Sequence, residues 1–226
     1  MNNVEIFIEE FNKLHKVLPS KEKEFGNAIK TLNHNPIIRK HKAKLELARK
    51  LRNILVHENR MSKVATPTNS IIKSLTEIRR KFENPATVNE FTKDVRIFDV
   101  KDTIYEVLKV IKKESISQFP VFDEENFKGI FSDNGITNWL AKEKMVYTKE
   151  TTIKDILSLD EHIESYQIVR MHKPLYEIEE IFYENIQKRG DANIIILITP
   201  MGDIKNKTDI RGIITPWDFP ELLTKL

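Results

Sequence analysis

Apolar residues recur at intervals of three to four in the first part of the chain, in four successive segments. This spacing puts the apolar side chains on one face of a helix. Pro19-Ser20, Asn35-Pro36 and the loop MSKVATPTN separate the segments and supply helix stops and N-caps. The segments cover residues 4–18, 21–33, 37–55 and 70–82. Four amphipathic helices joined by short loops predict a four-helix bundle over residues 1–83.

The rest of the chain alternates between strand-like and helix-like patterns, and the alternation occurs twice. Thr-Ile-Tyr-Glu-Val at 103–107 aligns with Pro-Leu-Tyr-Glu-Ile at 174–178, and Gly-Ile-Phe-Ser at 129–132 aligns with Gly-Ile-Ile-Thr at 212–215. Each copy predicts a strand, a helix, two strands joined by a hairpin, and a closing helix. The first two strands of the copies are predicted at 95–98, 119–122, 167–171 and 194–198.

Units of this length bury their apolar faces only by packing against one another, which predicts two α/β repeats related by a pseudo-two-fold axis. The predicted fold class is therefore α+β. A chain of 226 residues is long enough for two domains, a helical domain at 1–83 and a repeat domain at 84–226. Within the second domain, the repeats are expected at about 84–147 and about 148–226.

The composition limits the kinds of chemical site that the chain can hold and indicates its cellular location. The chain has no cysteine, which excludes disulfides, thiolate metal sites and cysteine nucleophiles. No histidine pair has the spacing of metal ligands, so we expect no metal. The chain starts with the acidic, amphipathic MNNVEIFIEEFNKL, and its longest apolar run is Ile194–Ile198. We therefore expect neither an export signal nor a membrane span, and a cytoplasmic location.

The net charge of +3 hides an uneven distribution. Residues 1–83 hold 18 Lys and Arg against 9 Asp and Glu, whereas the remainder holds 19 against 25. A basic half is one sign of an RNA or other anionic partner. Lysine-rich helices also give such counts through ordinary solvated faces, so both interpretations stay open.

One cluster of chemically active residues lies in the third helical segment. Arg52 and Asn53 precede the apolar triplet Ile54-Leu55-Val56, and His57 follows it. At about 100° per residue, Asn53 and His57 share a helix face, and Arg52 lies about 140° away from His57. Residues placed in this way do not contact one another directly, and they suit a site that is shared with a second helix or a second protomer.

This pattern in a basic helical segment resembles the HEPN family, helical bundles with a metal-independent ribonuclease site at a dimer interface. The resemblance covers at most residues 1–83. It implies that His57 handles the 2′-hydroxyl proton, Arg52 holds the scissile phosphate and Asn53 assists. Such cleavage needs a proton acceptor of near-neutral pKa and a fixed cation. Because the family also contains inactive members, a catalytic and a structural role of these residues both stay open.

The repeats carry a second resemblance. Ser-Gln-Phe-Pro-Val-Phe-Asp at 117–123, followed by Gly-Ile-Phe-Ser, and the later Gly-Ile-Ile-Thr-Pro-Trp-Asp at 212–218 resemble paired CBS (cystathionine β-synthase) domains. The resemblance covers about residues 84–226. CBS pairs form a Bateman module, which senses adenosine-containing ligands in the clefts between its repeats.

The CBS resemblance implies ligand residues in the second repeat. Thr215 matches a hydroxyl that meets phosphate at a helix N-terminus, and Asp218 matches the carboxylate that accepts from the ribose hydroxyls. Ile213 matches an apolar wall against adenine, and Asn193 matches a polar position ahead of the central strand. The first repeat reads Ser132-Asp133-Asn134-Gly135 and lacks the ribose carboxylate, so one competent cleft is expected.

Other observations leave the ligand and the role of the carboxylate open. Asp218 also suits a structural role, offsetting the helix dipole in the first turn of the last helix. Ser117-Gln118 and Ala192-Asn193 occupy positions where Arg or His would balance nucleotide phosphates. AMP, ATP and S-adenosyl compounds therefore all remain candidate regulatory ligands. Trp139 and Trp217 are expected in the core or between the repeats.

Two functions of different classes stay open. In the first, the CBS pair senses an adenosine ligand and regulates a helical domain that binds or cleaves RNA. In the second, the protein is a non-catalytic nucleotide sensor, and its helical domain dimerises or docks a partner. A homodimer is expected in either case.

Overall fold

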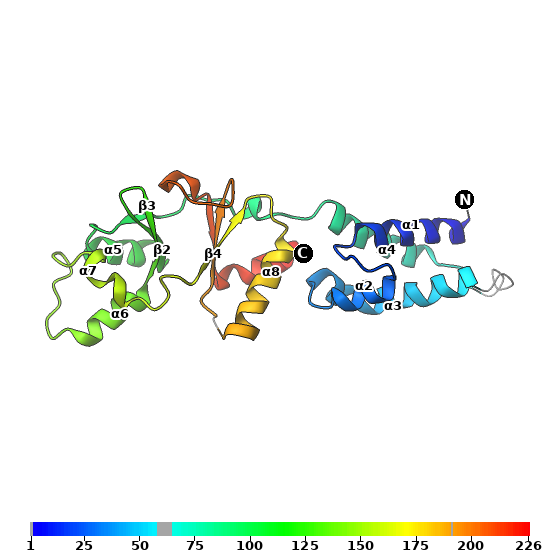
Figure 1. Cartoon of the computed structure of the whole chain (residues 1–226), viewed down its shortest axis with the longest axis horizontal. Helices are drawn as coiled ribbons and strands as arrows, with labels where there is room; N and C mark the ends of the chain where they lie inside the picture. Colours follow the sequence, from blue (N-terminus) through cyan, green and yellow to red (C-terminus); the bar gives the residue numbers. More distant parts are fainter. Residues whose placement is uncertain (1, 58–64, 191) are drawn as a thin grey trace. The chain divides into compact units, whose positions relative to one another are not determined.

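The computed structural model of the chain describes residues 2–57, 65–190 and 192–226. It contains both helices and sheets (Figure 1), which confirms the α+β class. The chain divides into two compact units, and the predicted domain boundaries stay predictions. Unit 1 comprises Met1–Ala86, Pro174–Ile181 and Glu221–Leu226, and unit 2 comprises Thr87–Lys173 and Phe182–Pro220.

Unit 1 begins with helices in each of the four predicted segments. Figure 1 shows α1 alongside α4 and α2 alongside α3. A capping box starts α1: the Asn2 side chain accepts from the Glu5 N–H, and the Glu5 carboxylate accepts from the Asn2 N–H. The four helices are α1 (Asn3–Val17), α2 (Phe25–Thr31), α3 (Pro36–His57) and α4 (Asn69–Glu83).

One apolar core joins these helices. Burying each of its large side chains contributes about 1.5–3 kcal/mol. Tyr176, in helix α8 (Leu175–Glu184), belongs to the same core, with its ring centroid 5.8 Å from that of Phe82. The helical unit therefore includes a segment that lies far along the chain. The fully buried members of the core include Phe7, Leu14, Ile38, Leu45 and Leu75.

Polar contacts fix the packing around this core. The Glu10 carboxylate of α1 accepts from Thr76 Oγ1 at 2.9 Å and from Arg79 Nε at 3.1 Å, which ties α1 to α4. The Asn35 side-chain amide donates to Glu180 Oε1 at 2.9 Å, which ties the start of α3 to α8. Burial raises the pKa of the Glu180 carboxyl, although His34 and Asn35 oppose the effect.

Unit 2 contains two three-stranded sheets of the same topology. In each sheet the first two strands are parallel and the last two are antiparallel. The predicted repeat is therefore present in the strand order, although the first strand forms at 98–99 and not at 95–98. The strands are β1 (Phe98–Asp99), β2 (Gln118–Asp123) and β3 (Asn126–Ser132), then β4 (Tyr166–Arg170), β5 (Ile195–Thr199) and β6 (Gly212–Ile214).

Helices connect and cover the strands. Thr103 caps the crossover helix α5 (Ile104–Glu114) in a capping box with Glu106. Trp139 of α6 is buried in the core of the first repeat, which confirms its predicted place. Trp217 is 88% exposed, so its predicted place in the core is wrong. The helices and turns are η1 (Val88–Phe91), α5 (Ile104–Glu114), α6 (Asp133–Lys142), α7 (Ile153–Ile156), η2 (Leu157–Leu159), η3 (Asn185–Arg189), η4 (Lys207–Asp209), η5 (Pro216–Asp218) and α9 (Phe219–Lys225).

The two aligned glycines explain how the repeats meet. A Cβ at Gly129 would lie 2.4 Å from the carbonyl oxygen of Ile163, just ahead of β4. A Cβ at Gly212 would lie 2.6 Å from the carbonyl oxygen of Phe91, ahead of β1. Each glycine thus admits the backbone that precedes the other repeat's first strand. The contact is sealed by an apolar cluster from both repeats: Phe122, Ile130, Ile195, Leu197 and Ile210.

Candidate functional site

A cleft of about 260 Å³ opens between the two repeats of unit 2. Ile130 of β3 and Ile195 of β5 line it with apolar surface, so both sheets contribute to it. Polar side chains supply the rest of the lining, which gives the cleft both the apolar surface and the hydrogen-bonding groups of a small-molecule site. These polar residues are Gln118, Ser132, Asp133, Asn134, Thr137, His162 and Asn193.

The wall of this cleft is fixed by a buried carboxylate. Asp160 accepts from the N–H of Ser132 at 2.5 Å and from its hydroxyl at 2.9 Å. The same carboxylate accepts from the N–H of His162 at 2.9 Å. Asp160 therefore holds the loop that carries His162 against the start of α6. The Ser132 hydroxyl donates to Asp160 and accepts from the Asn134 N–H, so its proton is already committed within the protein.

The structure separates the four ligand residues predicted from the CBS resemblance. Asn193 lines the 260 Å³ cleft, with its Nδ2 at 3.3 Å from His162 Nε2. Ile213 lies in β6, packed against the apolar cluster between the repeats, and Thr215 and Asp218 flank the turn that follows. None of these three is among the residues that line the cleft, in the part of the chain that the structure describes. Asn193 therefore lies apart from the other three, in a cleft lined mainly by residues of the first repeat.

Thr215 and Asp218 bind one another in a capping box. Asp218 Oδ2 accepts from the Thr215 N–H at 2.7 Å and from its hydroxyl at 2.9 Å. Lys93 Nζ lies 3.8 Å from Asp218 Oδ1. Asp218 thus has a structural role, because it caps the turn through its hydrogen bonds with Thr215. The Asp218 side chain is 22% exposed.

Trp217 lies on the surface, and not in the core or between the repeats where it was expected from the sequence. Pro216 and the Thr215–Asp218 capping box hold the backbone of the turn, and the indole between them is left pointing outward. A flat apolar ring beside a carboxylate suits the stacking of a planar ligand. The sequence signal for this exposed position was Pro-Trp-Asp after the Gly-strand, because it places one aromatic residue inside a capped turn.

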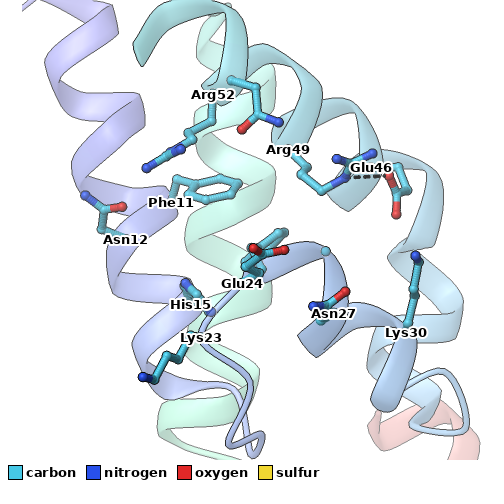
Figure 2. Close-up of a pocket in the computed structure, with 13 residues that line it drawn as sticks. Phe11, Asn12, His15, Lys23, Glu24, Asn27, Lys30, Glu46, Arg49 and Arg52 are labelled. Atoms are coloured by element: carbon cyan, nitrogen blue, oxygen red, sulfur yellow. Dashed lines mark hydrogen bonds and ion pairs between the residues drawn. The ribbon is translucent and has the colours of Figure 1, made fainter. Parts of the chain in front are cut away.

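In unit 1, Arg52 and Asn53 line a larger cavity of about 540 Å³ between α1, α2 and α3 (Figure 2). His57 is the last residue of α3, and its side chain lies outside the described residues. The structure therefore places two of the three predicted catalytic residues together. It also puts His15 of α1 in the same cavity, which spacing within α3 could not reveal.

Among residues 2–57, 65–190 and 192–226, no group of three or more His, Asp or Glu side chains could hold a metal ion. None of the helices in these ranges combines the length and the hydropathy needed to cross a bilayer.

Residues 88–142 match the CBS domain family, whereas no curated protein matches the chain. Three solved structures illustrate the likeness. The CBS domain pair of protein MJ0100, in complex with 5-methylthioadenosine and S-adenosyl-L-methionine, is 18% identical over 62% of this chain and 97% of its own, with a TM-score of 0.43.

The CBS domain of a bacterial CNNM/CorC family Mg²⁺ transporter, in complex with ATP, is 15% identical over 67% of this chain and 94% of its own, with a TM-score of 0.43. A hemolysin-like protein containing a CBS domain, from Oenococcus oeni PSU, is 19% identical over 65% and 96%, with a TM-score of 0.41. Within this chain, the similarity to the CBS domain family covers the segment from Val88 to Lys142.

Proposed function

We propose that the protein senses an adenosine-containing ligand in unit 2 and that ligand occupancy regulates the helical domain. The observation that carries the proposal is the cleft shared by two repeats of one topology, the first of which matches the CBS family. The proposal includes a cytoplasmic location, a helical bundle at 1–83 and CBS repeats at 84–226 related by a pseudo-two-fold axis.

The predicted ligand residues divide between two positions in this proposal. Asp218 Oδ1 accepts from ribose hydroxyls, with Lys93 and the Thr215 hydroxyl beside it for a phosphate. Ile213 provides an apolar wall for adenine. Asn193 contributes instead to the cleft at the first repeat, where the side-chain amide of Gln118 also faces the ligand space.

A thermal-shift panel tests the ligand class. The panel is AMP, ATP, S-adenosyl-L-methionine and 5-methylthioadenosine, with guanosine and cytidine nucleotides as controls. We expect at least one adenosine compound to raise the melting temperature, because a ligand that binds only the folded state stabilises it. No shift with any adenosine compound at millimolar concentration would contradict the proposal.

For the helical domain we propose RNA binding or cleavage, supported by the basic composition of residues 1–83 and by the shared position of Arg52 and Asn53. Labelled single-stranded RNA is incubated with the full chain in EDTA. Cleavage that is lost in His57→Ala supports a metal-independent ribonuclease.

The second candidate function is a non-catalytic sensor whose helical domain forms a homodimer or docks a partner. The exposed apolar side chains of Leu47 and Ile54, two turns apart on α3, favour such a contact. An RNA that stays intact with wild type and His57→Ala, together with a dimer in sedimentation, supports this function over the ribonuclease.

A further inference from the structure

The cavity of unit 1 has the size of a small-molecule site. Its volume of about 540 Å³ falls within the range of about 300–1,000 Å³ that is typical of ligand pockets. Phe11 and Phe25 form its apolar floor, with ring centroids 4.3 Å apart. The polar side chains around the opening come from α1, α2 with the segment before it, and α3 (Figure 2): Asn12, His15, Lys23, Glu24, Asn27, Lys30, Glu46, Arg49, Arg52 and Asn53.

The cavity is positive. Four cationic side chains line it against two carboxylates, and Glu46 is engaged by Arg49 Nε at 2.9 Å. Lys23, Lys30 and Arg52 make no ion pair with any residue in the described part of the chain. Cationic side chains that line a cavity and have no protein partner can bind an anion there.

The position of Arg49 suits a phosphate. A Cβ at residue 26 would lie 3.2 Å from Arg49 Cδ, so Gly26 lets the arginine stem lie against the first turn of α2. Its Nε is held by Glu46, and its two terminal nitrogens have no partner among the described residues. A guanidinium fixed at one nitrogen presents the others in a defined direction, which favours two-point contact with phosphate oxygens.

The remaining polar groups of the lining indicate that the same ligand also carries hydroxyl groups. Glu24 lies between His15 and Arg49 in Figure 2, and its carboxylate would repel a bare anion but accept from a hydroxyl. The side-chain amides of Asn12, Asn27 and Asn53 both donate and accept. The lining therefore combines cations for a phosphate with acceptors for donor groups.

We propose that this cavity binds a small hydroxylated phosphate ester, of which a sugar phosphate and a ribonucleotide are the two sources. The site lies within one protomer and is separate from the adenosine ligand of unit 2. It requires neither RNA cleavage nor the side chain of His57.

Titration calorimetry on the full chain tests the proposal with ribose 5-phosphate, UMP, inorganic phosphate and uncharged ribose. These probes lack adenine, and saturating adenosine ligand in a second series keeps unit 2 out of the measurement. We expect ribose 5-phosphate and UMP to bind better than phosphate and ribose. UMP binding much more tightly than ribose 5-phosphate identifies a ribonucleotide, and equal binding identifies a sugar phosphate.

Three variants make the test specific. Arg52→Gln should weaken ribose 5-phosphate about tenfold or more, because a charged hydrogen bond is lost. Arg80→Gln, at an exposed arginine of α4 outside the cavity, should leave the affinity unchanged. Glu24→Gln should strengthen the binding of inorganic phosphate, because a carboxylate that repels the anion is removed, and should reduce the preference for ribose 5-phosphate. No saturable binding of either ester at millimolar concentration, or equal binding by wild type and Arg52→Gln, overturns the proposal.

Discussion

Replacing Gly129 by alanine tests how the repeats of unit 2 meet. Gly129 has φ +119°, a conformation that a side chain disfavours by about 1–2 kcal/mol. The added Cβ would also lie 2.4 Å from Ile163 O and 2.7 Å from Ile163 Cγ1. Moving that segment costs about 1–3 kcal/mol by overpacking. It also weakens the 3.0 Å hydrogen bond from Ile130 N to Ile163 O, worth about 1 kcal/mol.

These contributions predict a loss of about 3–6 kcal/mol in the free energy of unfolding of unit 2. Gly190→Ala is the matched control, because Gly190 also has positive φ, +67°, but no described atom lies within 4 Å of its added Cβ. The control should lose only about 1 kcal/mol.

Urea unfolding followed by tryptophan fluorescence measures this difference. Both tryptophans of the chain, Trp139 and Trp217, lie in unit 2, so the signal reports that unit alone. With an m-value of about 2 kcal/mol/M, the midpoint of Gly129→Ala should fall by about 1.5 M or more. A shift no larger than that of Gly190→Ala would refute the proposed close contact between the repeats.

Three further predictions concern both units. Burial tends to raise the pKa of the Glu10 carboxyl, but hydrogen bonds from Thr76 and Arg79 outweigh it and lower that pKa. Glu10→Gln should therefore lower the free energy of unfolding by about 1–2 kcal/mol at neutral pH, as measured by circular dichroism in urea. This loss should vanish as the pH falls through the lowered pKa. Burial raises the pKa of the Glu180 carboxyl, so the contribution of Glu180 to stability is present below the ordinary glutamate pKa and is lost as pH rises through the raised pKa. Glu180→Gln should therefore raise the melting temperature relative to wild type more at about pH 8 than at about pH 4. The same increase at both pH values would contradict this prediction. If Trp217 stacks on the ligand, adenosine compounds should quench the fluorescence of wild type and leave that of Trp217→Phe unchanged.

Much of the fold could be predicted from local sequence. The helices start where Asn2, Thr68 and Thr103 supply caps, because a cap depends on residues only three positions apart. The repeated strand order could be predicted because the Gly-strands at 129–132 and 212–215 carry the same pattern. The sequence alone could not show why both strands start with glycine. The reason is steric, because the carbonyl oxygen of Ile163 approaches Gly129 and that of Phe91 approaches Gly212, each from the other repeat.

The remaining features depend on contacts between distant segments. Tyr176 aligned with a repeat position but packs in the core of unit 1, because residues 174–181 belong to that unit. Trp217 is exposed because a capped turn, and not an amphipathic helix, sets its direction. Asn193 lines the cleft between the repeats because it precedes β5, whose Ile195 belongs to the same apolar cluster as Ile130. His15 reaches the Arg52 cavity from another helix, and no spacing rule within one helix predicts such a pair.

Titration calorimetry of Asp218→Asn against wild type tests the adenosine site most directly. The ligand is the adenosine compound that gives the largest thermal shift, and Asp203→Asn, at an exposed aspartate of the hairpin before β6, is the control. Asparagine keeps an acceptor for Thr215 but removes the charge that the ribose hydroxyls would meet. We expect affinity to fall about tenfold or more in Asp218→Asn and to stay unchanged in Asp203→Asn. An unchanged dissociation constant in Asp218→Asn would contradict the site.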